Sequence, residues 1–126
     1  MLFLIRGIPG SGKSTLAKRL IEKGLADVHL EADMYFEVDG SYAFDPSKVS
    51  EAHKWCQEET ARAILDGKRV AVSNTFVKKW EAEPYLELAS THGVGVSVIV
   101  TKGNYQNIHS VPEEVILRMK ENWEEF

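Results

Sequence analysis

Short apolar runs alternate with amphipathic stretches along the whole chain. An apolar run of about four to eight residues is typical of a buried strand, whereas apolar positions three and four residues apart are typical of a helix with one buried face. The runs predict four strands, at residues 2–6, 27–30, 69–73 and 94–101. The amphipathic stretches predict four helices, at residues 13–22, 46–67, 81–92 and from 112 onward.

This alternation of strands and helices favours one fold class. Because a helix separates most strands from the next, right-handed crossovers should join the strands into a parallel sheet with helices on both faces. We therefore predict a three-layer α/β fold that forms a single domain over residues 1–126. Parallel strands all end at the same edge of a sheet, where ligands bind. The segments that should meet at this edge are residues 7–14, 31–36, 74–76 and 101–103.

Residues 33–43 carry no clear periodicity, and we expect them to be irregular. Asp39 and Gly40 form a turn signal within this stretch. Asp45 followed by Pro46 is typical of a helix N-cap and the first helical residue. The long second helix should therefore begin here.

The segment directly after the first predicted strand matches a phosphate-binding pattern. The sequence GIPGSGKS follows the P-loop signature of glycine, four residues, glycine, lysine and a hydroxyl residue. The alternative is a glycine-rich turn without a ligand, but the preceding strand and the following amphipathic helix favour the P-loop. The predicted nucleotide-binding residues are Gly7, Pro9, Gly10, Ser11, Gly12, Lys13, Ser14 and Thr15.

Each residue type in this loop suits a nucleoside triphosphate. Glycines let backbone amides approach a phosphate without a Cβ clash, and the following helix adds the positive end of its dipole. Lys13 would place a cation on the β- and γ-phosphates, the Ser14 hydroxyl would ligate Mg²⁺, and Thr15 is suited to a lower phosphate. ATP and Mg²⁺ are therefore the predicted ligands.

Asp33 follows the second predicted strand, on the edge that should face the γ-phosphate. As a general base it would orient an acceptor hydroxyl and take its proton. The alternative is an N-cap or loop carboxylate without a catalytic role. Glu31 and Asp39 are weaker candidates, which we expect to be solvated.

Asn74 and Thr75 end the third predicted strand, where many P-loop enzymes place an acidic metal-binding residue. The sequence VAVSNTF has no acid there, so Mg²⁺ would depend on Ser14, on water and on Asp33 as a further candidate. Asn74 or Thr75 could bind an acceptor or metal-bound water. The alternative is that they only complete the end of the strand.

The polar segment 102–111 follows the fourth predicted strand and is a candidate lid over ATP. Its candidate basic residues are Lys102 and His109, with Arg118 further on in the last predicted helix. The alternative is a solvated loop.

Composition excludes several classes of protein. No apolar run approaches the roughly 20 residues of a membrane span, and residues 1–5 are too short for a signal peptide. Cys56 is the only cysteine, so no internal disulfide is possible, and a reducing cytoplasm fits. The formal net charge of −4 argues against a broad basic face for duplex binding, although a small basic pocket remains compatible.

Five segments together resemble a known group of proteins. They are LIRGIPGSGKSTLAKRL, EADMYF, DGSYAFDPSKVSEAHKW, SNTFVKKWEAEPYLELA and NIHSVPEEVILRMKENWE. They resemble small phage and cellular P-loop ATP-binding proteins of AAA-domain-like type, which are similar to the kinase domain of 5′-hydroxyl polynucleotide kinases. The resemblance implies a P-loop kinase-like fold whose four parallel strands lie in the order 2-3-1-4.

The resemblance also implies an activity: transfer of the γ-phosphate of ATP to a hydroxyl, with a nucleic-acid or nucleotide 5′-OH as acceptor. Asp33 holds the position of the general base, and Thr75 matches an acceptor-binding threonine. Phe36 stands where polynucleotide kinases usually carry an acceptor-binding arginine. The candidate acceptor residues are the one at this position and the two at the end of the third predicted strand: Phe36, Asn74 and Thr75. The lid segment looks shortened and contains no arginine.

Two further functions stay open. The chain could be a nucleotide-binding module or slow ATPase without kinase activity, or it could phosphorylate a nucleoside or another small metabolite. The missing lid arginines motivate the first alternative, because an arginine at the transferring phosphate is worth about 10³–10⁵ in rate.

Overall fold

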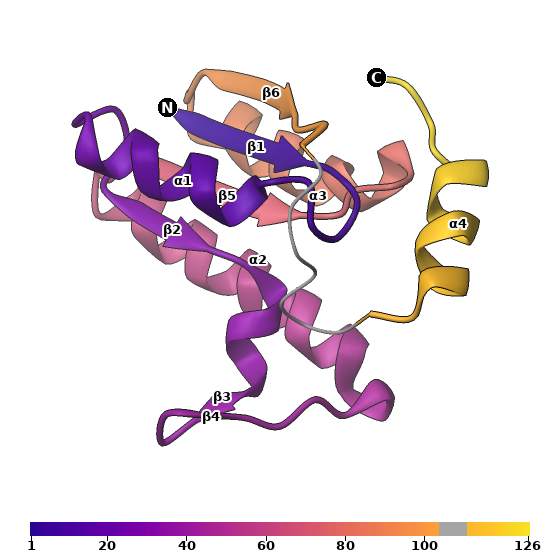
Figure 1. The fold of residues 1–126 in the computed structure, drawn as a ribbon. Helices are drawn as coiled ribbons and strands as arrows, with labels where there is room; N and C mark the ends of the chain where they lie inside the picture. The colour runs from indigo at the N-terminus through magenta and orange to yellow at the C-terminus, as the bar shows by residue number, and fades with distance from the viewer. Residues whose placement is uncertain (104–110) are drawn as a thin grey trace.

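The structure, a computed structural model, describes residues 1–103 and 111–126. A four-stranded parallel sheet forms its centre (Figure 1). The elements follow one another as β1 (Leu2–Arg6), α1 (Lys13–Glu22), β2 (Val28–Leu30), the 3₁₀ helix η1 (Ala32–Phe36), β3 (Glu37–Val38), β4 (Ser41–Tyr42), the 3₁₀ helix η2 (Pro46–Lys48), α2 (Val49–Leu65), β5 (Val70–Asn74), α3 (Lys79–Thr91), β6 (Val96–Val100) and α4 (Glu113–Glu121).

The order of the strands in the sheet is β2-β5-β1-β6. Counted among the parallel strands alone, this is the second, third, first and fourth, in agreement with the order that the resemblance implied. The numerals differ because the short strands β3 and β4 form a separate two-stranded hairpin. Arg6 at the end of β1 pairs with Asn74 on one side and Val100 on the other, so three strands end level with one another.

Alternating side chains of the central strands divide the core into two layers. Leu2 and Leu4 of β1 belong to the cluster on the face covered by α2 and α3. Ile5 of β1 and Ala71 of β5 belong to a second cluster, on the face covered by α1. Because successive strand residues point to opposite faces, a continuous apolar run such as VAV can fill both layers. The predicted three-layer α/β architecture is confirmed, and Figure 1 shows α1 on one side of the sheet with α2 and α3 on the other.

The segment expected to be irregular contains more structure than its pattern indicated. Residues 32–36 form η1, and β3 and β4 pair as an antiparallel hairpin. Asp39 and Gly40 both have positive φ, of 51° and 81°, which is the geometry of a type I′ hairpin turn. Asp45 accepts a hydrogen bond from the Ser47 amide with Pro46 at the first helical position, so the predicted cap is confirmed at the start of η2.

The last helix ends earlier than its apolar stripe predicted. Helix α4 stops at Glu121, and Trp123 and Phe126 lie outside it. Their rings cover the guanidinium of Arg6, whose Cζ is 4.0 Å from the centroid of Trp123 and 3.6 Å from that of Phe126. Arg6 is fully buried and donates to the carbonyl oxygens of Phe76, Val77 and Glu124. A desolvated cation needs such partners, and the segment after α4 supplies several of them.

Within residues 1–103 and 111–126, none of the helices is both long enough and apolar enough to cross a lipid bilayer.

Candidate functional site

The loop between β1 and α1 has the backbone of a phosphate-binding loop. Gly10 and Gly12 have φ values of 82° and 97°, which favour glycine at both positions. Gly12 is the N-cap of α1 and offers no side chain to the first amides of the helix. These amides, with the positive end of the helix dipole, form a site suited to an anion.

Hydrogen bonds hold this loop against the residues that follow β5 and β6. The Ser11 hydroxyl lies 2.6 Å from the Thr101 hydroxyl, and the Gly103 amide donates to the Ser11 carbonyl. A Cβ atom on Gly7 would collide with the hydroxyl oxygens of both Ser11 and Thr101. Gly7 also donates its amide to the Thr75 carbonyl. Glycine at position 7 therefore lets the loop pack closely against the β6 side, while its amide binds the β5 side.

Lys13 begins α1 and turns its ammonium group back over the loop. Its Nζ donates to the carbonyl of Ile8 at 3.0 Å. Burial lowers the pKa of Lys13 to about 8, against the opposing effect of the Glu31 and Asp33 carboxylates. The charges of Glu31 and Asp33 therefore reach the ammonium of Lys13.

Glu31 accepts hydrogen bonds from two different segments of the fold. The Ser14 hydroxyl donates to Oε2 at 3.0 Å, and the Ser73 hydroxyl donates to the same oxygen at 2.9 Å. Ser73 lies in turn 2.6 Å from Nε2 of His29, which is itself 3.6 Å from Oε2. The P-loop, β2 and β5 thus converge on one carboxylate oxygen.

The expectation that Glu31 is solvated is wrong, because 16% of its side chain is exposed and its carboxylate is held by neighbours. Burial alone would raise the pKa of Glu31, but the neighbouring His29 imidazole and the hydrogen bonds from Ser73 and Ser14 hold it below its usual range. The carboxylate is therefore ionised at neutral pH. The sequence signal that could have placed Glu31 in the site is its position one residue beyond β2, at the ligand edge of the sheet.

Asp33 lies within η1, next to the hairpin of β3 and β4. The N-cap position of η1 belongs to Glu31, so the N-cap interpretation of Asp33 is wrong. The Tyr42 hydroxyl donates to Oδ1 of Asp33 at 3.3 Å. The sequence pattern does not indicate this contact, because it depends on the short hairpin of β3 and β4.

Two of the three candidate acceptor residues point into the protein. Phe36 is 5% exposed and packs edge-on against Tyr35, Tyr42 and Phe44, so it belongs to the core instead of an acceptor site. Asn74 is buried as well, and its Oδ1 accepts the amide of Ala32, which fastens η1 to β5. Thr75 is half-buried next to Gly7 and keeps its predicted place at the ligand edge.

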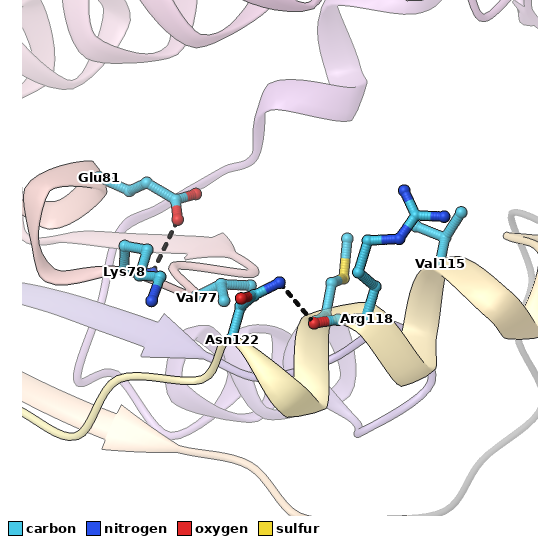
Figure 2. A pocket seen from close by; sticks show the side chains of 7 residues that line it. Val77, Lys78, Glu81, Val115, Arg118 and Asn122 are labelled. Carbon is cyan, nitrogen blue, oxygen red and sulfur yellow. Dashed lines mark hydrogen bonds between the residues drawn. The ribbon is translucent and has the colours of Figure 1, made fainter.

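The candidate lid residues lie in different parts of the chain. Lys102 is exposed after β6, and His109 lies outside the described residues. Arg118 is exposed on α4 and borders an open hollow of about 290 Å³ between α4 and the start of α3. Figure 2 shows Lys78 and Glu81 on the α3 side of this hollow, opposite Arg118 and its neighbours on α4. The lid remains a prediction.

A P-loop opposite two carboxylates is an arrangement found in nucleotide-binding enzymes. Residues 2–109 match the family AAA_33, which is described as an AAA domain. The chain belongs to this family. NEDD4-binding protein 2 from Homo sapiens is 36% identical to this AAA domain over 136 residues, covering 100% of the chain but only 8% of that longer protein.

Three solved structures share the fold. Kti12 from Chaetomium thermophilum, in complex with ADP-AlF3, has a TM-score of 0.71 and 14% identity over 99% of this chain and 81% of that one. A gluconokinase from Sinorhizobium meliloti has a TM-score of 0.64 and 16% identity over 98% of this chain and 74% of that one. A chain of the Pnkp1/Rnl/Hen1 RNA repair complex has a TM-score of 0.62 and 18% identity over 94% of this chain and 35% of that one. This AAA domain therefore has a P-loop kinase-like fold.

Proposed function

We propose that this AAA domain transfers the γ-phosphate of ATP to a hydroxyl acceptor, and that the acceptor is a nucleic-acid or nucleotide 5′-OH. The observation that carries this proposal is the geometry of the loop: Gly10 and Gly12 take positive φ directly before α1, and Lys13 turns its ammonium over the loop, within reach of the charges of Glu31 and Asp33. A cation for the phosphates and a base for the acceptor at one site are the minimum that phosphoryl transfer requires.

The proposed reaction divides between the loop and Asp33. Backbone amides from Gly10 to Ser14 hold the phosphates, and the Lys13 ammonium moves from the Ile8 carbonyl onto the β- and γ-phosphates. Asp33 accepts the proton of the acceptor hydroxyl while the acceptor oxygen bonds to the γ-phosphorus. The bond between that phosphorus and the β,γ-bridging oxygen breaks, and ADP leaves.

The residues present also fit a magnesium ion. Ser14 offers a hydroxyl oxygen and Glu31 a carboxylate oxygen, and oxygen ligands are those that Mg²⁺ prefers. When bound, the ion neutralises charge on the β- and γ-phosphate oxygens. Ser14 is the residue in this chain that would ligate it directly.

The nucleic-acid acceptor is supported by the sequence resemblance to 5′-hydroxyl polynucleotide kinases and by the RNA repair complex among the structures of similar fold. Thr75 at the ligand edge and Tyr42 beside Asp33 would border the acceptor hydroxyl. The candidate lid residues Lys102, His109 and Arg118 would close over the bound ATP.

An acceptor panel tests this function. The protein is incubated with ATP labelled at the γ-phosphate and with 5′-hydroxyl oligonucleotides of RNA and DNA, mononucleosides, gluconate and water alone. Labelled oligonucleotide is the expected product. Preference for a mononucleoside or a sugar acid would indicate a small-metabolite kinase and would contradict the nucleic-acid acceptor.

A second function is a nucleotide-binding module or slow ATPase. It is favoured by Phe36, which is buried at the position where polynucleotide kinases usually carry an acceptor-binding arginine. In the same panel, tight ATP binding with no labelled acceptor would support this alternative and contradict the kinase.

A further inference from the structure

We infer that Glu31 supplies the acidic contact to Mg²⁺ that P-loop enzymes usually take from the third strand, and that Ser73 and His29 hold Glu31 in place for this role. The inference rests on the proposed binding of Mg²⁺ and ATP. It assigns to the residue after β2 a contact that the sequence of β5 cannot provide.

The third parallel strand, β5, ends in Ser73 and Asn74, and neither is an acid. Asn74 is turned inward to the amide of Ala32. Ser73 is 1% exposed, and its hydroxyl points across to the neighbouring strand, where it donates to Glu31. β5 lacks a carboxylate of its own, but its Ser73 holds the carboxylate of Glu31, which directly follows the adjacent strand β2.

Glu31 also touches the residue that would ligate the metal. Its Oε2 accepts the hydroxyl of Ser14, so the carboxylate lies one hydrogen bond from the predicted ligand. The Ser14 hydroxyl oxygen keeps a lone pair for the ion while its proton points to Glu31. A hydrogen bond to a carboxylate makes such a hydroxyl a better ligand for a cation.

The two carboxylate oxygens of Glu31 differ in their contacts. Three groups, on Ser14, Ser73 and His29, surround Oε2. Among residues 1–103 and 111–126, no hydrogen bond is found at Oε1. An oxygen of an ionised carboxylate that is oriented by its partner oxygen and still open is suited to a metal-bound water, because Mg²⁺ keeps several waters in nucleotide sites.

Ser73 and His29 form a line of hydrogen bonds that positions the Glu31 carboxylate. Ser73 donates to Glu31 and, because its only proton is used there, it accepts from Nε2 of His29 at 2.6 Å. Loss of the Ser73 hydroxyl would free the carboxylate to rotate without removing its charge. Ser73→Ala should therefore act in the same direction as Glu31→Gln, but more weakly.

The test measures metal dependence without any acceptor. Binding of the non-hydrolysable analogue AMP-PNP is measured by calorimetry in EDTA and over a series of free Mg²⁺ concentrations, with Mn²⁺ and its electron paramagnetic resonance as a direct probe of the ion. Glu31→Gln is the main variant, because an amide oxygen can still accept the hydrogen bonds of Ser14 and Ser73. Glu37→Gln, an exposed carboxylate on β3, is the matched control.

We expect Glu31→Gln to raise the Mg²⁺ concentration for half-maximal AMP-PNP binding by about tenfold to a hundredfold, the usual cost of losing an outer partner of a metal ligand. Its affinity in EDTA should stay within about twofold of the wild type or become tighter, because the variant removes a negative charge near the phosphates. Ser73→Ala should shift the Mg²⁺ requirement by a smaller factor, and Glu37→Gln should not shift it.

Three results would overturn the inference: an unchanged Mg²⁺ requirement in Glu31→Gln, an equal loss of affinity in EDTA and in Mg²⁺, or a wild-type protein whose AMP-PNP binding ignores Mg²⁺. Failure here is separable from failure of the kinase proposal. The kinase proposal fails in the acceptor panel even if the metal titration behaves as expected, and the Glu31 inference fails in the titration even if the acceptor is phosphorylated.

Discussion

The hydroxyl of Tyr42 donates a hydrogen bond to Oδ1 of Asp33 over 3.3 Å. The two residues are brought together by the hairpin of β3 and β4, which folds back beside η1. Partial burial and the charge of Asp33 raise the pKa of Tyr42 to about 12, so the phenol remains a donor throughout the neutral range. Tyr42 is thus placed to orient the proposed general base.

Tyr42→Phe should lower the rate of phosphoryl transfer by about twofold to tenfold, the effect of losing one modest hydrogen bond that orients a reacting group. ATP affinity should stay within about twofold of the wild type, because Asp33 acts on the acceptor. Single-turnover transfer and equilibrium ATP binding measure the two effects separately.

Tyr35→Phe is the matched control for this experiment. Tyr35 belongs to the same segment, and its hydroxyl donates to the exposed Glu51 at 3.0 Å. We expect this variant to transfer phosphate at the wild-type rate. A rate loss equal to that of Tyr42→Phe would mean that the segment as a whole, and not the contact with Asp33, affects catalysis.

ATP binding should depend on pH through Lys13. Its pKa in the free protein is lowered to about 8, and only the ammonium form attracts the polyphosphate. Affinity should therefore be full below pH 8 and fall as pH rises above it, by up to about tenfold per pH unit, with a proton taken up on binding. Calorimetry at pH 7 and pH 9, in buffers of different ionisation enthalpy, measures both effects.

Lys13→Arg keeps its charge over this range, so its affinity should be weaker overall but flat between pH 7 and pH 9. The same fall with pH in Lys13→Arg would assign the titration to another group.

The C-terminal aromatic residues should stabilise the fold through Arg6. The Arg6 guanidinium is fully buried, and the ring of Trp123 covers it at 4.0 Å. Trp123→Ala should lower the free energy of unfolding by about 1–3 kcal/mol, because a desolvated cation loses its aromatic partner and meets water. Denaturation in urea measures the change.

Trp80→Ala is the control, since Trp80 is 69% exposed on α3. It should change stability little. Equal stability of the Trp123→Ala variant and the wild type would show that the contact of the Trp123 ring with Arg6 does not stabilise the fold.

Stability should also depend on pH through an exposed ion pair. Arg69 donates to both carboxylate oxygens of Asp27, which ties the end of the α1–β2 connection to the start of β5. The hydrogen bonds from Arg69 hold the pKa of Asp27 well below its usual range. A lowered pKa in the folded state gives stability that is present above the unfolded-state pKa of about 4 and is lost as pH falls.

Asp27→Asn should therefore lower the melting temperature at pH 7, and the difference from the wild type should shrink as pH falls below about 4. High salt should reduce it too, because both side chains are exposed. A difference that is constant from pH 7 to pH 2 would assign the effect to the lost hydrogen bonds instead of the charge.

The strands and the P-loop could be predicted from the sequence because their signals are local, whereas the order of the strands came from the resemblance. Apolar runs define the four strands, the order of the elements defines the crossovers, and Gly7 to Ser14 form one continuous signature. Asp45 and Pro46 are likewise a cap that adjacent residues determine.

The rest of the site depends on contacts between segments far apart in the chain. The sequence around Glu31 predicts a solvated acid, whereas Ser14 and Ser73, which are 17 and 42 residues away, hold its carboxylate. Phe36 and Asn74 lie at or beyond strand ends on the ligand edge, but strand direction alone does not decide which side chains turn inward, and both are buried. The hairpin that carries Tyr42 is two residues long in each strand, too short for an alternating pattern to show.

The most direct test of the proposed function compares two variants of the same site. Lys13→Ala removes the cation that would hold the phosphates, and Asp33→Asn removes the proposed base while keeping its shape. Transfer of labelled γ-phosphate to a 5′-hydroxyl oligonucleotide is measured for both, alongside ATP affinity. We expect both variants to lose transfer, by at least about a hundredfold for Asp33→Asn, and only Lys13→Ala to lose most of its ATP binding. Transfer by Asp33→Asn at the wild-type rate would contradict this mechanism.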